Sequence, residues 1–223
     1  MIGRIRQSVI GVQIDAISWD DAIARVLGWA RTRESRYVCL CNVHVTVTAR
    51  QDPEFGRIVS AADLATPDGA PVAWMLRRFG FPHQQRVDGP DLTWRLCSES
   101  ARAGIPVYFL GGSEATLEAL TRNLLAAFPG LVIAGAESPP YRSLTPGEMA
   151  ATIQRINDSK SGIVFVGLGC PKQERWMYEM RGKVLATMIG VGAAFDFHAG
   201  TIKRAPAWMR RIGAEWLFRL GSE

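Results

Sequence analysis

Long apolar runs are missing from this 223-residue sequence, and no stretch approaches the ~20 uninterrupted apolar residues that span a bilayer. The N-terminal segment up to Ile14 carries two arginines but no apolar run that ends in a small-residue cleavage site. It therefore does not resemble a secretory signal. Together these absences favour a cytoplasmic protein.

Cysteines are few and lack the spacing of a metal site. The four, Cys39, Cys41, Cys97 and Cys170, include no CxxC pair. Cys39 and Cys41 flank one residue of an apolar run, so in a strand they would share one face and could not easily pair with each other. Buried free thiols in a reducing cytoplasm are the expected state.

Motifs that mark several enzyme classes are also absent. The three histidines have no HxxH or HExxH spacing and no Asp-x-Asp pair occurs, so a dedicated metal site has little support. No Gly-x-Ser-x-Gly elbow is present to anchor hydrolase chemistry. The dinucleotide fingerprint needs a third glycine where this sequence has Lys172, and the residue order does not fit a Walker P-loop, which disfavours NAD and ATP sites.

What the sequence does contain is an alternation of apolar runs and amphipathic segments, with 48% hydrophobic and 21% charged residues. This composition supports a real core in one α/β domain. We predict strands at residues 37–41, 63–66, 107–110, 131–134, 163–166 and 185–190. We predict helices from Ser18 onward and at residues 52–61, 71–79, 90–103, 114–128, 145–157 and 171–180. Such alternation predicts a Rossmann-like, mostly parallel sheet with helices on both faces, spanning residues 1–200.

Ligands of such sheets bind beyond the carboxyl ends of the strands, and two glycine-containing turns lie there. Gly111-Gly112-Ser113 follows one predicted strand, and Gly167-Leu168-Gly169 with Lys172 follows another. Glycines let backbone amides approach an anion, and a helix start adds unpaired N–H groups. Each turn alone is equally consistent with a simple strand-to-helix connection and a solvated lysine. Two such turns in one sheet suit a nucleotide diphosphate better than either does singly.

Two aspartates are the candidate acidic groups. Asp68, in Pro67-Asp68-Gly69, follows a predicted strand, where it is either a turn former or a carboxylate that takes a proton from an attacking hydroxyl. Asp196 lies between Phe195 and Phe197, which should be buried, so it needs partners such as backbone amides or a ribose hydroxyl.

The last 23 residues, 201–223, form a separate basic and aromatic segment that we expect to be helical. Five basic residues against one acid lie between Lys203 and Arg219, within a chain of net charge +5. Trp208, Ile212 and Trp216 recur every four residues and would form one apolar stripe on a helix. The segment is either a terminal helix docked on the core or an interfacial element that meets lipid and phosphates. Its candidate membrane or acceptor residues are Arg204, Trp208, Arg210, Arg211 and Arg219.

Taken together, the motifs resemble the WecG/TagA/CpsF family, glycosyltransferase family 26, over nearly the whole chain. The matching pieces are Asn42, Ala62-Asp63-Leu64, Pro67-Asp68-Gly69, Arg86-Val87, Gly89, Asp91-Leu92, Phe109-Leu110-Gly111-Gly112, Phe128-Pro129-Gly130, Gly167-Leu168-Gly169, Pro171-Lys172-Gln173-Glu174, Phe195-Asp196, Ala199-Gly200, Lys203-Arg204-Ala205-Pro206 and Glu215-Trp216-Leu217-Phe218-Arg219.

The resemblance implies a metal-independent, inverting transferase that uses a UDP-sugar donor, carrying N-acetylmannosamine, its uronate or a hexose, and no other cofactor. The implied acceptor is an undecaprenyl-diphosphate-linked sugar at the inner face of the plasma membrane, in cell-surface polysaccharide synthesis. Asp68 is then the proposed base, Gln173 lies in the active site, and Arg86 contacts a diphosphate or the acceptor. Candidate substrate-binding residues are Asn42, Gly69, Gly111, Gly112, Ser113, Gly167, Gly169, Lys172 and Asp196.

The sequence departs from the family pattern at two places. Some members have a threonine where this chain has Leu40, so a hydroxyl role at that position is lost or moved. Members usually continue into a further basic tail, whereas this sequence ends at Glu223, and weaker membrane attachment is expected. A homo-oligomer is compatible with the tryptophan-rich end, and no nucleic-acid partner is expected. The alternatives are an NAD-dependent nucleotide-sugar oxidoreductase or epimerase, and a non-catalytic membrane- or nucleic-acid-binding module.

Overall fold

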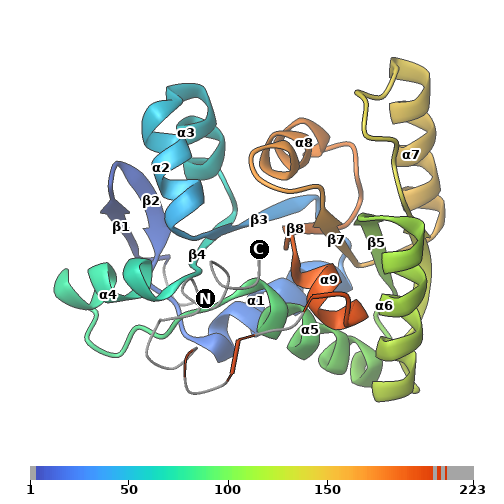
Figure 1. Cartoon of the computed structure of the whole chain (residues 1–223), viewed down its shortest axis with the longest axis horizontal. Coiled ribbons are helices and arrows are strands. Elements are labelled where there is room, and N and C mark those ends of the chain that lie inside the picture. Colours follow the sequence, from blue (N-terminus) through green and yellow to red (C-terminus); the bar gives the residue numbers. More distant parts are fainter. Residues whose placement is uncertain (1–3, 203–204, 207–208, 210–223) are drawn as a thin grey trace.

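A six-stranded, fully parallel sheet forms the centre of the computed structural model, which describes residues 4–202, 205–206 and 209. The strand order is β4-β3-β8-β7-β5-β6 (Figure 1). The strands are β3 (Arg36–Cys41), β4 (Leu64–Pro67), β5 (Val107–Gly111), β6 (Ile133–Glu137), β7 (Ile163–Gly167) and β8 (Thr187–Gly190). An antiparallel hairpin, β1 (Arg6–Val9) and β2 (Val12–Asp15), forms a second, two-stranded sheet. The predicted α/β, mostly parallel fold is confirmed.

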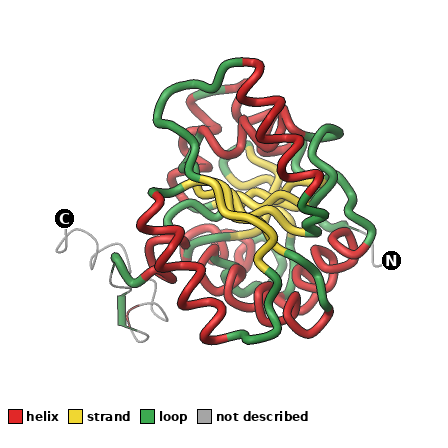
Figure 2. Tube along the Cα trace, turned by 90° about the vertical axis from the view of Figure 1, so that its right-hand side faces the viewer, coloured by secondary structure: helices red, strands yellow, loops and turns green. Residues whose placement is uncertain are grey.

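Helices cover both faces of the sheet, so the strands form a layer between them (Figures 1 and 2). One face packs against α2, α3, α4, α7 and α8 together with the hairpin, and the other against α1, α5, α6 and α9. The helices are α1 (Trp19–Arg31), α2 (Val43–Gln51), α3 (Pro53–Ser60), α4 (Ala70–Arg78), α5 (Gly89–Ala103), α6 (Glu114–Ala127), α7 (Pro146–Asp158), α8 (Lys172–Met180) and α9 (Ala194–Ala199). No helix of the described part is long and apolar enough to cross a membrane.

Side-chain caps account for where many of the helices begin. Ser18 accepts a hydrogen bond from the amide of Asp21 at 3.1 Å, which confirms the predicted helix start there. Thr145 and Glu148 form a reciprocal capping box at α7. In a parallel sheet the helix that follows a strand starts at that strand's carboxyl end. The positive ends of several helix dipoles therefore point toward one edge of the sheet.

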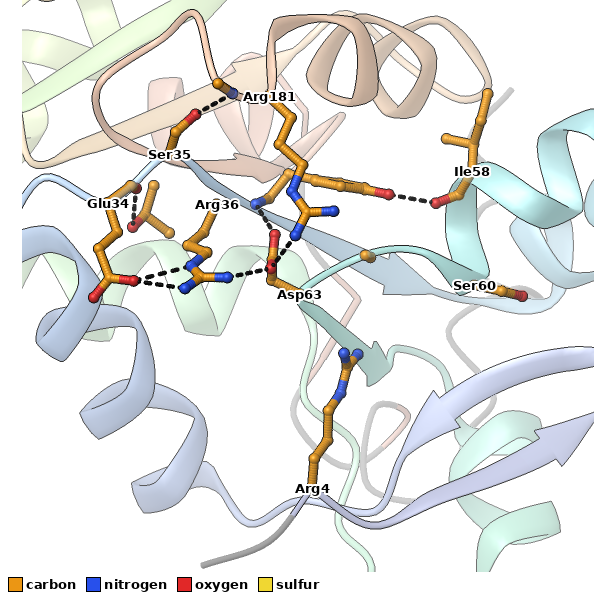
Figure 3. A network of polar contacts seen from close by, with 12 residues as sticks. Arg4, Glu34, Ser35, Arg36, Ile58, Ser60, Asp63 and Arg181 are labelled. Carbon is orange, nitrogen blue, oxygen red and sulfur yellow. Dashed lines mark hydrogen bonds and ion pairs between the residues drawn. The ribbon is translucent and has the colours of Figure 1, made fainter. Parts of the chain in front are cut away.

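Asp63 ties together the opposite, amino-terminal edge of the sheet (Figure 3). Its Oδ1 accepts from Arg36 Nη1 at 3.0 Å and from Arg181 Nη2 at 2.8 Å, and its Oδ2 accepts from the Tyr37 amide at 3.1 Å. These bonds join the starts of β3 and β4 to the end of α8. The Asp63 that is part of the family motif is therefore placed far from the edge where ligands bind, and its contacts are those of a structural residue.

Several elements differ from the prediction, among them the short helix α9, which was not predicted. The helix α2 was not predicted because its β-branched residues have low helix propensity, which burial of Val45, Thr46 and Ala49 overrides. The β1–β2 hairpin turns at Ile10 and Gly11, with φ of 52° and 87°, without the usual Asn-Gly signal. The strand β6 lies two to three residues later than predicted, because Gly135, which interrupts the apolar run, leaves room for the Tyr108 ring.

Cys39 and Cys41 lie on the same face of the sheet, and they and Cys97 are free and buried, as predicted. Cys170 is free but only half-buried, which differs from the prediction. The predicted division of the chain after residue 200 stays a prediction, because most of the segment beyond it lies outside the described residues. The same holds for Arg204, Trp208, Arg210, Arg211 and Arg219.

Candidate functional site

The chain diverges at the carboxyl ends of two neighbouring strands, β5 and β7. From β5 it continues through α6 on one face of the sheet to β6, and from β7 it continues through α8 on the other face to β8. Connections that leave adjacent parallel strands in opposite directions open a crevice between them, which is where ligands bind in such sheets.

A cavity of about 840 Å³ occupies this crevice. It is lined by the two glycine turns, by the loop after β8, by α9 and by the loop 139–144. Seven of the predicted binding residues line it together: Gly111, Gly112, Ser113, Gly167, Gly169, Lys172 and Asp196. Residues from four separate parts of the sequence thus meet around one space of the size of a small-molecule site.

The two turns approach each other so closely that glycine is required. Gly111 has a φ of 118°, and a Cβ built on it would lie 2.5 Å from the backbone carbon and oxygen of Gly167. A Cβ on Gly167 would lie 2.6 Å from the ring of Phe195. At Gly169, with a φ of 77°, nothing lies within 4 Å of that position. The cavity wall here is therefore backbone, whose amides can contact an anion without intervening side chains.

The cavity has an available cation. Arg142 and Arg175 also line it, but Arg142 pairs with Glu148 at 2.6 Å and Arg175 with Asp52 at 2.6 Å. Lys172, exposed at the start of α8, takes part in no ion pair among the described residues. With the N-termini of α6 and α8 beside it, this end of the cavity favours a negatively charged group.

Asp196 lies half-buried at the cavity wall. Its Oδ1 accepts from Thr116 Oγ1 and from Thr201 Oγ1, both at 3.4 Å. Its side-chain partners among the described residues are therefore threonine hydroxyls of α6 and of the chain after α9, and not the backbone amides that were predicted. Both bonds are long and weak, so the carboxylate keeps acceptor capacity for a hydroxyl group in the cavity.

Asn42, Asp68 and Arg86 gather at a different point of the same edge, which we call the β3–β4 corner. The Asp68 amide donates to Cys41 O at 3.1 Å, beside Asn42, and a Cβ on Gly69 would lie 3.6 Å from that of Asn42. The residue after Arg86, Val87, donates its amide to the last carbonyl of β4 at 3.0 Å. Backbone pairing therefore brings three residues from distant parts of the sequence together.

Asn42 and Arg86 hold their neighbours at this corner with their side chains. Asn42 Oδ1 accepts from the Val45 amide at 3.0 Å and caps α2. Arg86 Nη2 pairs with Asp88 Oδ2 at 2.9 Å, while Asp88 Oδ1 caps α5. Asp68 is half-buried. None of the three corner residues lines the cavity.

The corner and the cavity are separated by the width of the sheet between them. From β4 through β3 and β8 to β7 there are three strand-to-strand steps, which at the usual spacing amount to ~14 Å. The loop after β8, with Gly192 at the cavity wall, lies between them. A ligand that contacts both groups must extend along the carboxyl edge across β8.

Gln173 lies beneath this loop. Its side chain is buried; its Oε1 accepts from the Gly192 amide at 3.1 Å and its Nε2 donates to Glu174 Oε1 at 2.8 Å. Gln173 does not itself line the cavity. The structure therefore places Gln173 behind the loop that forms the cavity wall, and its catalytic role stays a prediction.

Glu174, which follows it, is fully buried, and burial is the largest influence on its carboxyl pKa, which it raises. Contacts with Gln173, Cys170 and His44 lower this pKa less than burial raises it. A buried carboxyl without a paired cation favours the neutral form.

We expect this burial to make stability depend on pH. Because the pKa of Glu174 is higher in the folded than in the unfolded state, the folded state holds the proton more tightly. The stability that the protonated carboxyl of Glu174 contributes is therefore fully present below the unfolded-state pKa of about 4.3. It is lost as the pH rises through the pKa of the folded state. Glu174→Gln removes this dependence. The melting temperature of the variant minus that of wild type should therefore be larger at pH 7 than at pH 4, which thermal unfolding at the two pH values measures. If this difference is the same at both pH values, the burial of Glu174 does not make stability depend on pH.

Sequence reasoning missed one wall of the cavity, the loop 139–144. The loop follows β6, which ends at the same edge of the sheet, and Pro139-Pro140 after a strand is the signal that could have indicated it. Among the described residues, no group of three or more His, Cys, Asp or Glu side chains is placed to hold a metal ion.

Comparison with known proteins shows which family and which proteins this chain is similar to. The sequence profile described as the glycosyl transferase WecG/TagA/CpsF family matches residues 7–223. A protein of Bacillus spizizenii named N-acetylglucosaminyldiphosphoundecaprenol N-acetyl-beta-D-mannosaminyltransferase is 30% identical over 185 residues, which cover 82% of this chain and 70% of that relative.

Proposed function

Because the chain belongs to the WecG/TagA/CpsF family of glycosyltransferases, we propose that it transfers a sugar from a UDP-sugar to an undecaprenyl-diphosphate-linked sugar. The sugar is N-acetylmannosamine, its uronate or a hexose, and the product serves cell-surface polysaccharide synthesis. The name of the Bacillus spizizenii relative supports the lipid-linked acceptor. Because the chain belongs to a transferase family, this function is preferred over the two alternatives, an NAD-dependent oxidoreductase or epimerase and a non-catalytic binding module.

The observation that carries the donor assignment is the cavity between β5 and β7. Its volume suits a nucleotide sugar, since small-molecule sites span roughly 300–1,000 Å³. Backbone amides of the glycine turns, two helix N-termini and Lys172 suit the diphosphate. Asp196, with only long hydrogen bonds, suits a ribose hydroxyl.

The acceptor assignment follows from the β3–β4 corner. With the diphosphate bound at the glycine turns, the donor sugar extends across β8 toward Asp68. Asp68 then takes the proton of the acceptor hydroxyl as its oxygen attacks the anomeric carbon, and UDP leaves from the opposite face with inversion. Arg86 lies at the same corner, where its charge can meet the acceptor diphosphate.

In this proposal the charge that grows on the leaving UDP is met by the turn amides and Lys172 instead of a metal ion. The proposal also includes peripheral attachment to the inner membrane face. The basic and aromatic residues of the C-terminal segment support it by their composition: Arg204, Trp208, Arg210, Arg211 and Arg219.

A UDP-release assay tests the proposed function. The purified chain is mixed with each of several UDP-sugars, with and without a synthetic lipid-diphosphate-linked sugar. We expect release of UDP that needs both substrates, unchanged after dialysis against EDTA. Release without acceptor, or none with any donor, would contradict the proposed transfer, and loss after dialysis would contradict its metal independence.

Lys172 gives a direct test of the donor cavity. Lys172→Gln removes the one positive charge in the cavity lining that forms no ion pair with a described residue. We expect UDP affinity to fall about tenfold at low salt, the scale of one charged hydrogen bond, and less at high salt because ions screen the contact. Lys183→Gln, at an exposed lysine beyond α8, is the matched control. Titration calorimetry with UDP measures both, and equal affinities for the two variants would place the diphosphate elsewhere.

A further inference from the structure

Glu174 is an unusual member of the first turn of α8. Its side chain is completely buried, although acidic side chains are almost never buried without a partner. Oε1 accepts a hydrogen bond from Gln173 Nε2 at 2.8 Å. Oε2 is buried and accepts no hydrogen bond of normal geometry. The mechanism proposed above makes no use of this carboxyl group.

Within the described part of the chain, no lysine or arginine pairs with Glu174 to explain its burial. The titratable groups facing it are the thiols of Cys39 and Cys41 on β3, the thiol of Cys170, and His44 at the start of α2. No ion pair among the described residues includes Glu174. Apart from its contact with the weakly hydrogen-bonding thiol of Cys170, the side-chain hydrogen bond that its carboxyl makes with a described residue is the bond from Gln173.

That bond decides which way the Gln173 amide points. A glutamine amide has an oxygen that accepts and an NH₂ group that donates, and the two differ only by a half-turn of the amide group. The Gly192 N–H requires the oxygen, which lies 3.1 Å from it. In the flipped orientation the NH₂ group would face the Gly192 N–H, donor against donor. An acceptor at Glu174 Oε1 holds the NH₂ group on its own side and so excludes the flip.

We propose that Glu174 is a positioning residue, which orients the Gln173 amide so that it holds the Gly192 N–H and thereby fixes the loop after β8 at the wall of the cavity. The proposal rests on the proposed function in one respect, because the cavity is taken as the UDP site. Gly192 lies at that wall between the glycine turns and the β3–β4 corner. A displaced loop would therefore disturb both the diphosphate and the path of the donor sugar.

The test compares two variants that differ in their acceptor. Glu174→Gln keeps an oxygen that can accept from Gln173 and is nearly the same size. Glu174→Met keeps similar bulk but has no such acceptor. Amide hydrogen exchange of Gly192, measured by NMR, reports the bond that its N–H donates to Gln173 Oε1 at 3.1 Å, because the second bond of this N–H, to Val166 O, is 3.4 Å long and weak. We expect wild-type exchange in Glu174→Gln and exchange at least about tenfold faster in Glu174→Met, the scale of one lost hydrogen bond.

UDP affinity is measured on the same samples. We expect it to fall about tenfold in Glu174→Met and to stay within about twofold of wild type in Glu174→Gln. Slow Gly192 exchange in a folded Glu174→Met would overturn the proposal. The proposal would also be overturned if Glu174→Gln showed the same fast exchange and weak UDP binding as Glu174→Met. That result would mean that the carboxyl group itself is needed and that an acceptor alone is not sufficient.

One further variant and one further outcome keep the test decisive. If Glu174→Met does not fold, Glu174→Asp withdraws the acceptor by one methylene, and we expect intermediate Gly192 exchange; exchange at the wild-type rate would overturn the proposal. If the wild-type chain does not bind UDP, the proposed function fails, while the exchange of Gly192 still decides the role of Glu174.

Discussion

Asp68→Asn should lower turnover by about 10²–10⁴-fold, the usual contribution of a general base. Asparagine has the same shape but cannot take the proton of the attacking hydroxyl. The fold should tolerate it, because two backbone hydrogen bonds that the substitution keeps hold the residue at the strand end: the Asp68 amide donates to Cys41 O at 3.1 Å and to Thr66 O at 3.0 Å. UDP affinity should be nearly unchanged, because Asp68 does not line the cavity.

The control is a carboxylate at the same edge of the sheet. Glu114 is exposed in the first turn of α6, next to the glycine turn after β5, and is far from the β3–β4 corner. Glu114→Gln should leave turnover within about twofold of wild type, since it removes an exposed charge only. Turnover is measured as UDP release at saturating donor and acceptor. Turnover of Asp68→Asn close to that of Glu114→Gln would show that another group accepts the proton.

Gly111→Ala should abolish UDP binding and destabilise the chain strongly. The new Cβ would lie 2.5 Å from the backbone of Gly167, so β5 and β7 could not keep their present separation at the cavity. The φ of 118° adds strain, because side-chain-bearing residues rarely adopt it. We expect a loss of about 3 kcal/mol or more in the free energy of unfolding, since strain of ~1–3 kcal/mol combines with the clash.

Gly182→Ala separates strain from the clash. Gly182 has a φ of 83°, and nothing lies within 4 Å of a Cβ built on it. This variant should lose ~1–2 kcal/mol from backbone strain alone and should bind UDP like wild type. Urea unfolding and UDP titration of both variants make the comparison. If Gly111→Ala is as stable as Gly182→Ala, the close approach of the two turns is not a constraint on the fold.

Much of the fold follows from local patterns along the chain. The apolar runs of β3, β5 and β7 and the caps at Ser18 and Thr145 depend on residues close in sequence, so periodicity and capping rules predict them. The helix α2 shows the limit of such rules. Its β-branched residues oppose a helix locally, and only burial against the hairpin and α3 makes it one.

For the site, the turn chemistry was predictable and the grouping was not. A glycine with positive φ, such as Gly111 or Gly169, is required by the backbone of its own turn. Asp68 shows both roles that its sequence context left open. It stands in a turn, and that turn holds its carboxylate at the carboxyl edge of β4. Whether the carboxylate is the base stays a prediction that the asparagine variant tests.

The sequence by itself therefore determined the parallel α/β class, the glycine turns and the family of the chain, because each rests on residue types at short or fixed spacings. The tertiary structure alone decided which of these residues meet. The strands β7 and β8 enter the sheet between β3 and β5, and this order places the cavity and the β3–β4 corner apart on one edge. Strand order depends on pairing between segments far apart in the chain, which no local pattern specifies.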